Sequence, residues 1–327
     1  MLLHEISSGG GPEQAEVVQL MRQECPILEY LHFFTYPGRS HNLSADDDIT
    51  TNAEFRSLGD DYTVADDYDP SEVSFSLKIF GKDLTVDQAY LDGLGLPGGV
   101  DAAQAVGSAL GVQRRRFARN LGRNLNNYII NGNSSTSAKQ FEGMRRVISQ
   151  QLGASQTLDS LGANGLAVVM GNDNAAKAAQ QKFVEALQDL ISAVAGGATV
   201  LQMNRKIINR LSTIAREQCT TTIDQFGRPI TSFNGVPLLP AGFDRTGAEL
   251  LPFTETLGTS TSKCSTVLAM RSEEMAYWSF KTTPSGIKVY DPIRVGNKYT
   301  QTVELQLDSG EPFNARSLAA LPGVMLS

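Results

Sequence analysis

The longest helical pattern in the chain runs from about residue 101 to residue 130, and it limits the possible folds more than any other segment. Its apolar side chains form one stripe at helical spacing: Val106, Leu110, Phe117, Leu121, Leu125 and Tyr128. Gly107, Gly111 and Gly122 weaken a helix in isolation, so packing against another surface must hold this one. The rest of the chain therefore has to supply that surface.

Charge is distributed unevenly around this helix. At ~100° per residue, four arginines lie on the side opposite the apolar stripe: Arg115, Arg116, Arg119 and Arg123. Residues 102–141 contain these four, Arg114 and Lys139, and no acidic residue, whereas residues 42–72 contain ten acidic residues and a single basic one. Two interpretations are open: a solvated acidic loop and an exposed basic helix face, or complementary surfaces on neighbouring copies of the chain.

The composition is typical of a soluble globular protein. The chain has 327 residues, 41% of them hydrophobic and 19% charged, which is enough for one large or two medium domains. No apolar run reaches the roughly 18 residues of a membrane helix, and the first residues lack the order of a signal peptide, so we expect a cytoplasmic product and no membrane partner. A net charge of −7 argues against a dedicated nucleic-acid binder.

The glycine run GLGLPGG at residues 93–99 has the spacing of a dinucleotide-binding loop. Such a loop needs an acidic residue about 20 positions later to hold a ribose hydroxyl, and residues 102–141 contain none. Pro97 also removes one backbone N–H from the loop. We therefore interpret the run as a hinge and predict no cofactor.

Other catalytic patterns are missing from the sequence. The three histidines lie within residues 1–50, so no H-E-x-x-H zinc helix can form, and there is no phosphate-binding G-x-x-x-x-G-K-[ST] loop or G-x-S-x-G turn. The three cysteines are widely spaced and are typical of reduced structural thiols. We predict no catalytic, cofactor-binding or metal-ligating residue, and hence a protein that is not an enzyme.

Residues 1–50 are predicted to form an arm and residues 51–92 an extended β-hairpin. The arm contains a short helical pattern over residues 13–24, followed by apolar residues that we expect to be buried against a partner surface: Ile27, Leu28, Leu31, Phe33 and Phe34. Residues 73–80 alternate like a half-buried strand, and TNAEFRSLGDDYTV is the expected partner strand. A two-stranded ribbon is unstable by itself in water, so it should lie on another surface.

From residue 174 onward the sequence predicts a mixture of helices and strands. Residues 174–196 and 205–217 have helical spacing, and a short strand, ATVLQMN, lies between them. From Cys219 onward strand patterns prevail, with Asn234–Gly235 as a hairpin turn. The order of elements predicts an α+β fold without internal repeats.

This order of elements resembles the major capsid protein of tailed double-stranded-DNA phages, the Hong Kong ninety-seven-type capsid fold. The hairpin and long helix resemble that family in SLKIFGKDLTVDQAYLD, NLNNYIINGN and KQFEGMRRVI. Further along the chain, the similar stretches are VLQMNRKIINRLSTIA, FNGVPLLPAG and DPIRVGNKYTQTVELQL. The resemblance spans nearly the whole chain, in order.

The resemblance implies a domain plan. Residues 1–50 would be the N-terminal arm and residues 51–92 the extended loop. Residues 93–155 and 285–310 would form a peripheral domain with the long helix as its spine, and residues 156–284 and 311–327 an axial domain.

The resemblance also implies a function. Copies of the chain would assemble as hexamers and pentamers into an icosahedral virion shell, in the host cytoplasm, around double-stranded DNA held by non-specific contacts. A portal and a possible decoration protein would be further partners. Because the arm begins almost at residue 1, we expect a separate scaffolding protein. The alternatives are an encapsulin-like bacterial nanocompartment shell and a hydrolase whose site the sequence does not reveal.

The candidate intersubunit contacts come from three groups of residues. The first is apolar and lies in the arm: Ile27, Leu31, Phe33 and Phe34. The second is acidic and lies in the hairpin: Asp60, Asp61, Asp66, Asp67 and Asp69. The third is basic and lies on the spine helix: Arg115, Arg116, Arg119 and Arg123. We expect the acidic hairpin of one copy to reach the basic helix of another; the packaged genome is the alternative partner for the arginines.

Overall fold

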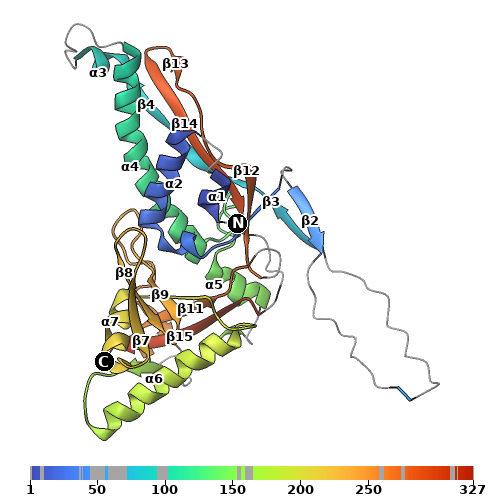
Figure 1. Ribbon diagram of the computed structural model, residues 1–327, viewed down its shortest axis with the longest axis vertical. Coiled ribbons are helices and arrows are strands. Elements are labelled where there is room, and N and C mark those ends of the chain that lie inside the picture. Colours follow the sequence, from blue (N-terminus) through green and yellow to red (C-terminus); the bar gives the residue numbers. More distant parts are fainter. Residues whose placement is uncertain are drawn as a thin grey trace.

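Helix α4 (Ala102–Asn131) runs along one side of an elongated molecule, which has a five-stranded sheet beside this helix and an eight-stranded sheet below it (Figure 1). The structure is a computed structural model. It describes residues 2–7, 11–36, 38, 40–44, 56–57, 72–93, 102–152, 156–158, 165–257, 261–273, 277–309, 314 and 316–326. The helix has the length that the sequence predicted.

The other helices of the described residues are shorter. They are α1 (Leu3–Ser7), α2 (Pro12–Glu24), the 3-10 helix η1 (Pro26–Glu29), α3 (Gln88–Gly93), α5 (Met144–Val147), the π-helical turn η2 (Ile148–Leu152), α6 (Asn174–Ala193) and α7 (Arg205–Ile214). Helix α7 begins at Asn204, whose side chain accepts a hydrogen bond from the Lys206 N–H and so caps the helix. The predicted helices are therefore present, and their ends lie within a few residues of the expected positions.

Strand β14 (Lys298–Asp308) is the centre of the five-stranded sheet. Antiparallel strand β4 (Lys78–Asp87) pairs with it from Lys298 to Leu307 on one side. On the other side it pairs with β12 (Phe280–Val289) and β13 (Ile293–Val295), and β1 (Phe33–Thr35) lies parallel to β12. Residues near the start of the chain are thus part of this sheet.

The eight-stranded sheet has the order β5-β15-β11-β6-β9-β8-β7, with β10 paired to β11. Its strands are β5 (Leu166–Val168), β6 (Val200–Met203), β7 (Cys219–Ile223), β8 (Pro229–Phe233), β9 (Val236–Pro240), β10 (Glu255–Leu257), β11 (Thr261–Met270) and β15 (Leu318–Leu326). The predicted Asn234–Gly235 turn joins β8 to β9, and both residues have positive φ angles, 48° and 85°, as a tight hairpin turn requires.

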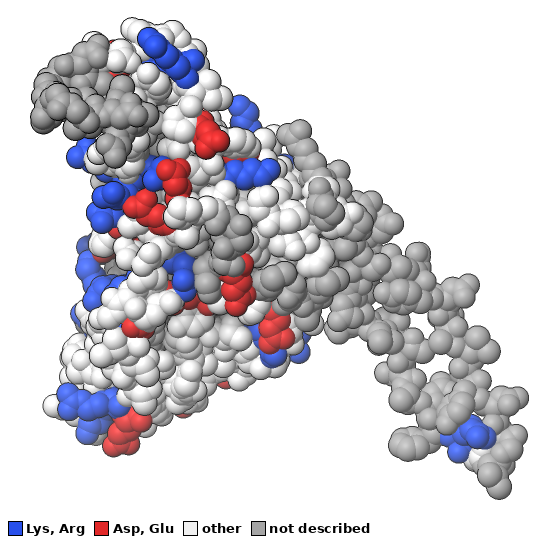
Figure 2. All heavy atoms as spheres, turned by 45° about the horizontal axis from the view of Figure 1, so that its top comes forward, with Lys and Arg blue, Asp and Glu red and all other residues white. Residues whose placement is uncertain are grey.

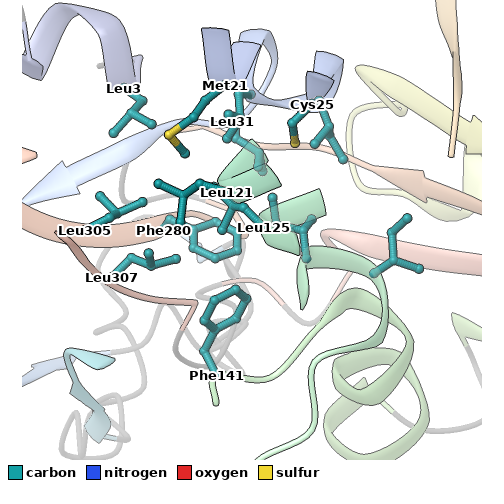
Figure 3. Packing of buried hydrophobic residues seen from close by; sticks show 14 of the residues in the cluster. Leu3, Met21, Cys25, Leu31, Leu121, Leu125, Phe141, Phe280, Leu305 and Leu307 are labelled. Carbon is teal, nitrogen blue, oxygen red and sulfur yellow. The ribbon is translucent and has the colours of Figure 1, made fainter. Parts of the chain in front are cut away.

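Two hydrophobic cores share the eight-stranded sheet. Successive side chains of a strand point to opposite faces, so Val267 and Ala269 of β11 join the core under α6 and α7. Leu268 and Met270 join the other core, which extends to α4 and the five-stranded sheet. Figure 3 shows this second core, where Leu125 of α4, Phe280 of β12 and N-terminal side chains converge.

The hairpin strand β3 (Glu72–Ser76) has a partner that the sequence did not predict. It pairs with β2 (Ser40–Ser44), a segment assigned to the arm, whereas the expected partner, residues 51–64, lies almost wholly outside the described residues. The chain then changes sheets at Leu77, because β4 pairs with β14. Most of the glycine run, residues 94–99, lies outside the described residues, and Gly93 is the last residue of α3. The hinge interpretation therefore stays a prediction.

Close packing of α2 against α4 leads to a first prediction. A Cβ atom at Gly122 would lie 2.8 Å from the Met21 carbonyl oxygen and 3.0 Å from Met21 Cα, so Gly122→Ala must push the two helices apart. We expect Gly122→Ala to lower the free energy of unfolding by about 1–3 kcal/mol in urea denaturation.

Gly107→Ala, on the same helix, is the matched control. Nothing lies within 4 Å of a Cβ atom at Gly107, so this change should stabilise the helix by about 0.5–1 kcal/mol. Equal stability of the two variants would contradict the close contact between α2 and α4.

Candidate intersubunit interface

The apolar residues of the predicted arm are buried within their own chain. Ile27, Leu31 and Phe33 are at most 1% exposed, and the Phe33 ring lies 5.8 Å from the Phe280 ring. The expectation that these side chains need a partner surface is therefore wrong, and they are not available for contact with another subunit. Phe34 alone of the four candidates is partly exposed.

Cys25 illustrates how deeply this N-terminal segment is packed. Its side chain has no exposed surface, and burial raises the pKa of the thiol well above its ordinary value. Leu3, Met21 and Leu31 lie in the same core as Leu121 of α4 (Figure 3). Residues 2–36 are thus largely a structural part of the body, apart from the few that are not described.

Acidic residues of α2 bind the arginines of α4 in the same chain. Arg114 Nη1 lies 2.8 Å from Glu13 Oε1, and Arg114 Nη2 lies 3.4 Å from Glu16 Oε2. The Arg114 side chain is only 9% exposed, and it also donates a hydrogen bond to Gln301 of β14. Arg114 therefore connects α4 to both α2 and the five-stranded sheet.

Two of the candidate arginines share this intramolecular role. Arg115 Nε lies 2.8 Å from Glu16 Oε1, and Arg123 Nε lies 2.8 Å from Glu24 Oε2. Both pairs are partly solvated, so each contributes roughly 0–1 kcal/mol to stability. Their partners come from α2, at the start of the same chain, and not from the acidic hairpin that the sequence suggested.

Arg116 and Arg119 remain available for another partner. Both side chains are exposed, and neither forms an ion pair or hydrogen bond with the part of the chain that the structure describes. Figure 2 shows basic side chains along the left side of the molecule, where Figure 1 places α4, with acidic side chains next to them. The arginines of α4 thus form two groups. Arg114, Arg115 and Arg123 form ion pairs with α2, whereas Arg116 and Arg119 are exposed.

The acidic candidates for intersubunit contact belong to the predicted hairpin. Asp60, Asp61, Asp66, Asp67 and Asp69 lie outside the described residues. Their contact with a basic surface stays a prediction.

A cleft of about 490 Å³ lies where α2, α4 and α7 meet the loop after β9. Its lining includes Glu24, Arg123, Asn126, Asn204 and Arg228. Arg123 is paired with Glu24, Arg228 with Asp224, and both asparagine side chains donate to backbone carbonyl oxygens. These paired polar groups therefore connect α2, α4, α7 and the loop after β9 across the cleft.

The ion pair between Asp224 and Arg228 is supported by several hydrogen bonds to the carboxylate. Burial by itself would raise the pKa of this carboxyl group, but hydrogen bonds from the backbone and side chain of Arg228 and from the Phe226 N–H hold it below the ordinary value. The carboxylate therefore stays charged near neutral pH, as a structural ion pair requires.

Two negative findings apply to the described ranges. They contain no group of three His, Cys, Asp or Glu residues that can hold a metal ion. They also contain no helix long and apolar enough to span a membrane.

Comparison with known proteins finds likeness in structure only. No protein-family model and no curated protein matches the sequence. The holo-SrpI encapsulin complex from Synechococcus elongatus PCC 7942 is 14% identical, with a TM-score of 0.54 over 93% of this chain and 89% of the other. The capsid of the native GTA particle is also 14% identical, with a TM-score of 0.55 over 91% of this chain and 89% of that one.

A third solved structure extends the likeness to an archaeal source. The virus-like particle from Pyrococcus furiosus is 10% identical, with a TM-score of 0.50 over 94% of this chain and 96% of that chain. The chain therefore has the α+β Hong Kong ninety-seven-type capsid fold that the order of its sequence motifs indicated.

The division of the basic face leads to a second prediction. Arg114→Ala removes a buried cation that contacts Glu13, Glu16 and Gln301, so we expect it to lower the free energy of unfolding by about 1–3 kcal/mol. Arg116→Ala, two positions along the same helix, should change it by less than about 0.5 kcal/mol, because that side chain is exposed. Urea denaturation of both variants measures the difference. If both variants lose a similar free energy of unfolding, Arg114 does not have the structural role that its contacts indicate.

Proposed function

We propose that this chain is a structural subunit that assembles with copies of itself into a closed shell. The observation that carries the proposal is the likeness of fold over more than nine-tenths of the chain to an encapsulin, a capsid and a virus-like particle.

Within such a subunit, α4 and the five-stranded sheet correspond to the peripheral domain, and the eight-stranded sheet with α6 and α7 to the axial domain. For these two domains we keep the boundaries proposed from the sequence, residues 93–155 with 285–310 and residues 156–284 with 311–327, although β12 (Phe280–Val289) of the five-stranded sheet crosses the one at residue 284. Strand β4, assigned by sequence to the extended loop, also contributes to the five-stranded sheet.

The more specific proposal is the major capsid protein of a tailed phage. The acidic segment of residues 42–72 favours it, since an extended hairpin rich in acidic residues suits contacts between many identical neighbours. In that role the partners are hexamers and pentamers of the chain, packaged double-stranded DNA, a scaffolding protein, a portal and a possible decoration protein, and the location is the virion capsid.

An encapsulin-like nanocompartment shell is the second candidate. The likeness to the holo-SrpI encapsulin is as extensive as the likeness to the capsid of the native GTA particle. The N-terminal segment, whose apolar residues were expected to be buried against a partner surface, packs into its own body, so it does not favour either candidate.

Electron microscopy of the expressed protein, alone and with the products of adjacent genes, tests the proposal. We expect capsomers, shells or tubes, because a shell subunit carries its own assembly contacts. Adjacent portal, protease and terminase genes would favour the phage, and an adjacent peroxidase or ferritin-like gene the nanocompartment. A protein that stays monomeric at high concentration and binds a small molecule would contradict both, and would favour a hydrolase.

The outward-facing arginines provide a test of the contact itself. If Arg116 and Arg119 bind the acidic hairpin of a neighbour, Arg116→Glu with Arg119→Glu should prevent assembly of empty shells without lowering stability, and Asp66→Lys with Asp67→Lys should partly restore it. Lys177→Glu with Lys182→Glu, the same charge change on the exposed side of α6, is the control and should assemble normally.

The packaged genome is the competing partner for these arginines. In that case the reversed-charge variant should form normal empty shells that retain DNA poorly and with a weaker dependence on salt. This result would contradict the pairing between subunits.

A further inference from the structure

Strand β7 (Cys219–Ile223) forms one edge of the eight-stranded sheet, in the lower part of the molecule in Figure 1. It pairs with β8 on one side, and four of its five residues are exposed. Residues 219–223 have no hydrogen bond beyond the β8 ladder to the part of the chain that the structure describes. The outer side of this strand is therefore open to a partner.

Strand β5, at the other end of the sheet order, is covered by side chains. Gln180 of α6 donates to the Val169 carbonyl oxygen at 3.2 Å, and Arg210 of α7 donates to the Val168 carbonyl oxygen. Contacts of this kind prevent another strand from adding to a sheet edge, as do prolines and charged residues within the edge strand. Strand β7 has the sequence CTTTI, which contains neither a proline nor a charge.

The ladder between β7 and β8 determines which backbone groups point outward. The Asn234 N–H donates to the Gln218 carbonyl oxygen at 3.0 Å, and the Asp224 N–H donates to the Arg228 carbonyl oxygen at 2.9 Å. Bonded pairs alternate with non-bonded pairs along an antiparallel ladder, so every second residue between these two bonds points to β8. The residues of β7 that point away from β8 are therefore Cys219, Thr221 and Ile223.

The strand is complementary to a second copy of itself. When two copies of β7 pair antiparallel with Thr221 opposite Thr221, Cys219 of each copy lies opposite Ile223 of the other. All three outward residues then face outward residues, so each N–H and C=O on the open side gains a partner. The pairing also places Ile223, which is 76% exposed, beside an apolar thiol side chain, and it opposes no like charges within the strand.

We propose that β7 is a self-pairing edge, which joins two copies of this chain as a two-fold symmetric, antiparallel strand pair centred on Thr221. An open edge binds an extended backbone, and a second β7 supplies one with matching spacing. A five-residue pair buries less than the about 1,200–2,000 Å² of a stable interface, so we expect a weak contact in the free chain. The pairing itself does not rest on the proposed function.

A closed shell would strengthen this contact. Other contacts would hold the copies close together, so the same strand pair would form more readily there, as a two-fold contact between subunits. Only this consequence rests on the proposed shell function.

Disulfide formation between introduced thiols tests the pairing. All variants carry Cys219→Ser, so the introduced thiol is the only accessible one, because Cys25 and Cys264 are buried. Thr221→Cys places two thiols on directly opposed residues with Cα atoms about 5.5 Å apart, which is within the range of a disulfide. We expect the unassembled chain to form a covalent dimer under mild oxidation, measured on a non-reducing denaturing gel.

Thr222→Cys is the matched control, because Thr222 is an exposed threonine of the same strand. Its two copies would be diagonal neighbours with Cα atoms about 7–8 Å apart, outside the range of a disulfide, so the dimer should form at least about tenfold more slowly than with Thr221→Cys. Equal rates in the two variants would indicate random collisions and overturn the proposal.

Thr221→Pro tests the backbone bonds by sedimentation velocity at increasing concentration. Thr221 points away from β8, so proline removes an outward N–H and leaves the β7–β8 ladder intact, and this variant should associate less than the unchanged chain. If it associates less although Thr221→Cys forms no dimer, β7 pairs with a different strand of the second copy. If association is unchanged, the edge is not a contact between copies. Either result overturns the proposal, and neither bears on whether the chain forms shells, which electron microscopy decides.

Discussion

The contact between the start of the chain and α4 supports most of the structure. Gly122 allows the backbone of α2 to approach α4 directly, and Arg114 joins α2, α4 and β14 at a buried position. Burial of Met21 and Leu31 then closes the core over the five-stranded sheet. Without this segment, part of the apolar stripe of α4 would be exposed, so the N-terminal residues contribute to the stability of the fold whatever they do in an assembly.

The two sheets are connected through polar as well as apolar contacts. Asn126 of α4 donates to the Ala241 carbonyl oxygen at 2.7 Å and accepts from Gln202 of β6, inside an otherwise hydrophobic region. Buried amides of this kind specify one arrangement, because a shift between the elements leaves polar groups without partners. The hydrogen bonds of Asn126 thus fix the direction of α4 relative to the eight-stranded sheet, which a purely apolar interface would specify less strictly.

The sequence predicted the parts of the fold that depend on local patterns. The stripe on α4, the starts of α6 and α7 and the Asn234–Gly235 turn follow from periodicity and turn chemistry, and the structure confirms them. Both α6 and α7 end a few residues before the predicted positions, at Ala193 and Ile214. The sequence did not predict that Phe33 would lie against Phe280, because the two are far apart in the chain and the segment around Phe33 lacks periodicity. For the same reason the pairing of β3 with β2 was not predicted. The ion pairs between α2 and α4 were also missed, because the acidic residues of α2 were read only as part of a helix, although their spacing along the helix was visible.

The alternating side chains of β11 have a mechanical consequence. Neighbouring residues of β11 belong to different cores. A tilt of α4 and the five-stranded sheet relative to α6 and α7 would therefore disturb the packing of both cores at once. Densely packed interiors resist such a disturbance, so we expect the two sheets and their helices to move as one rigid unit. Bending is then expected where segments leave the two sheets, as at Leu77 between β3 and β4.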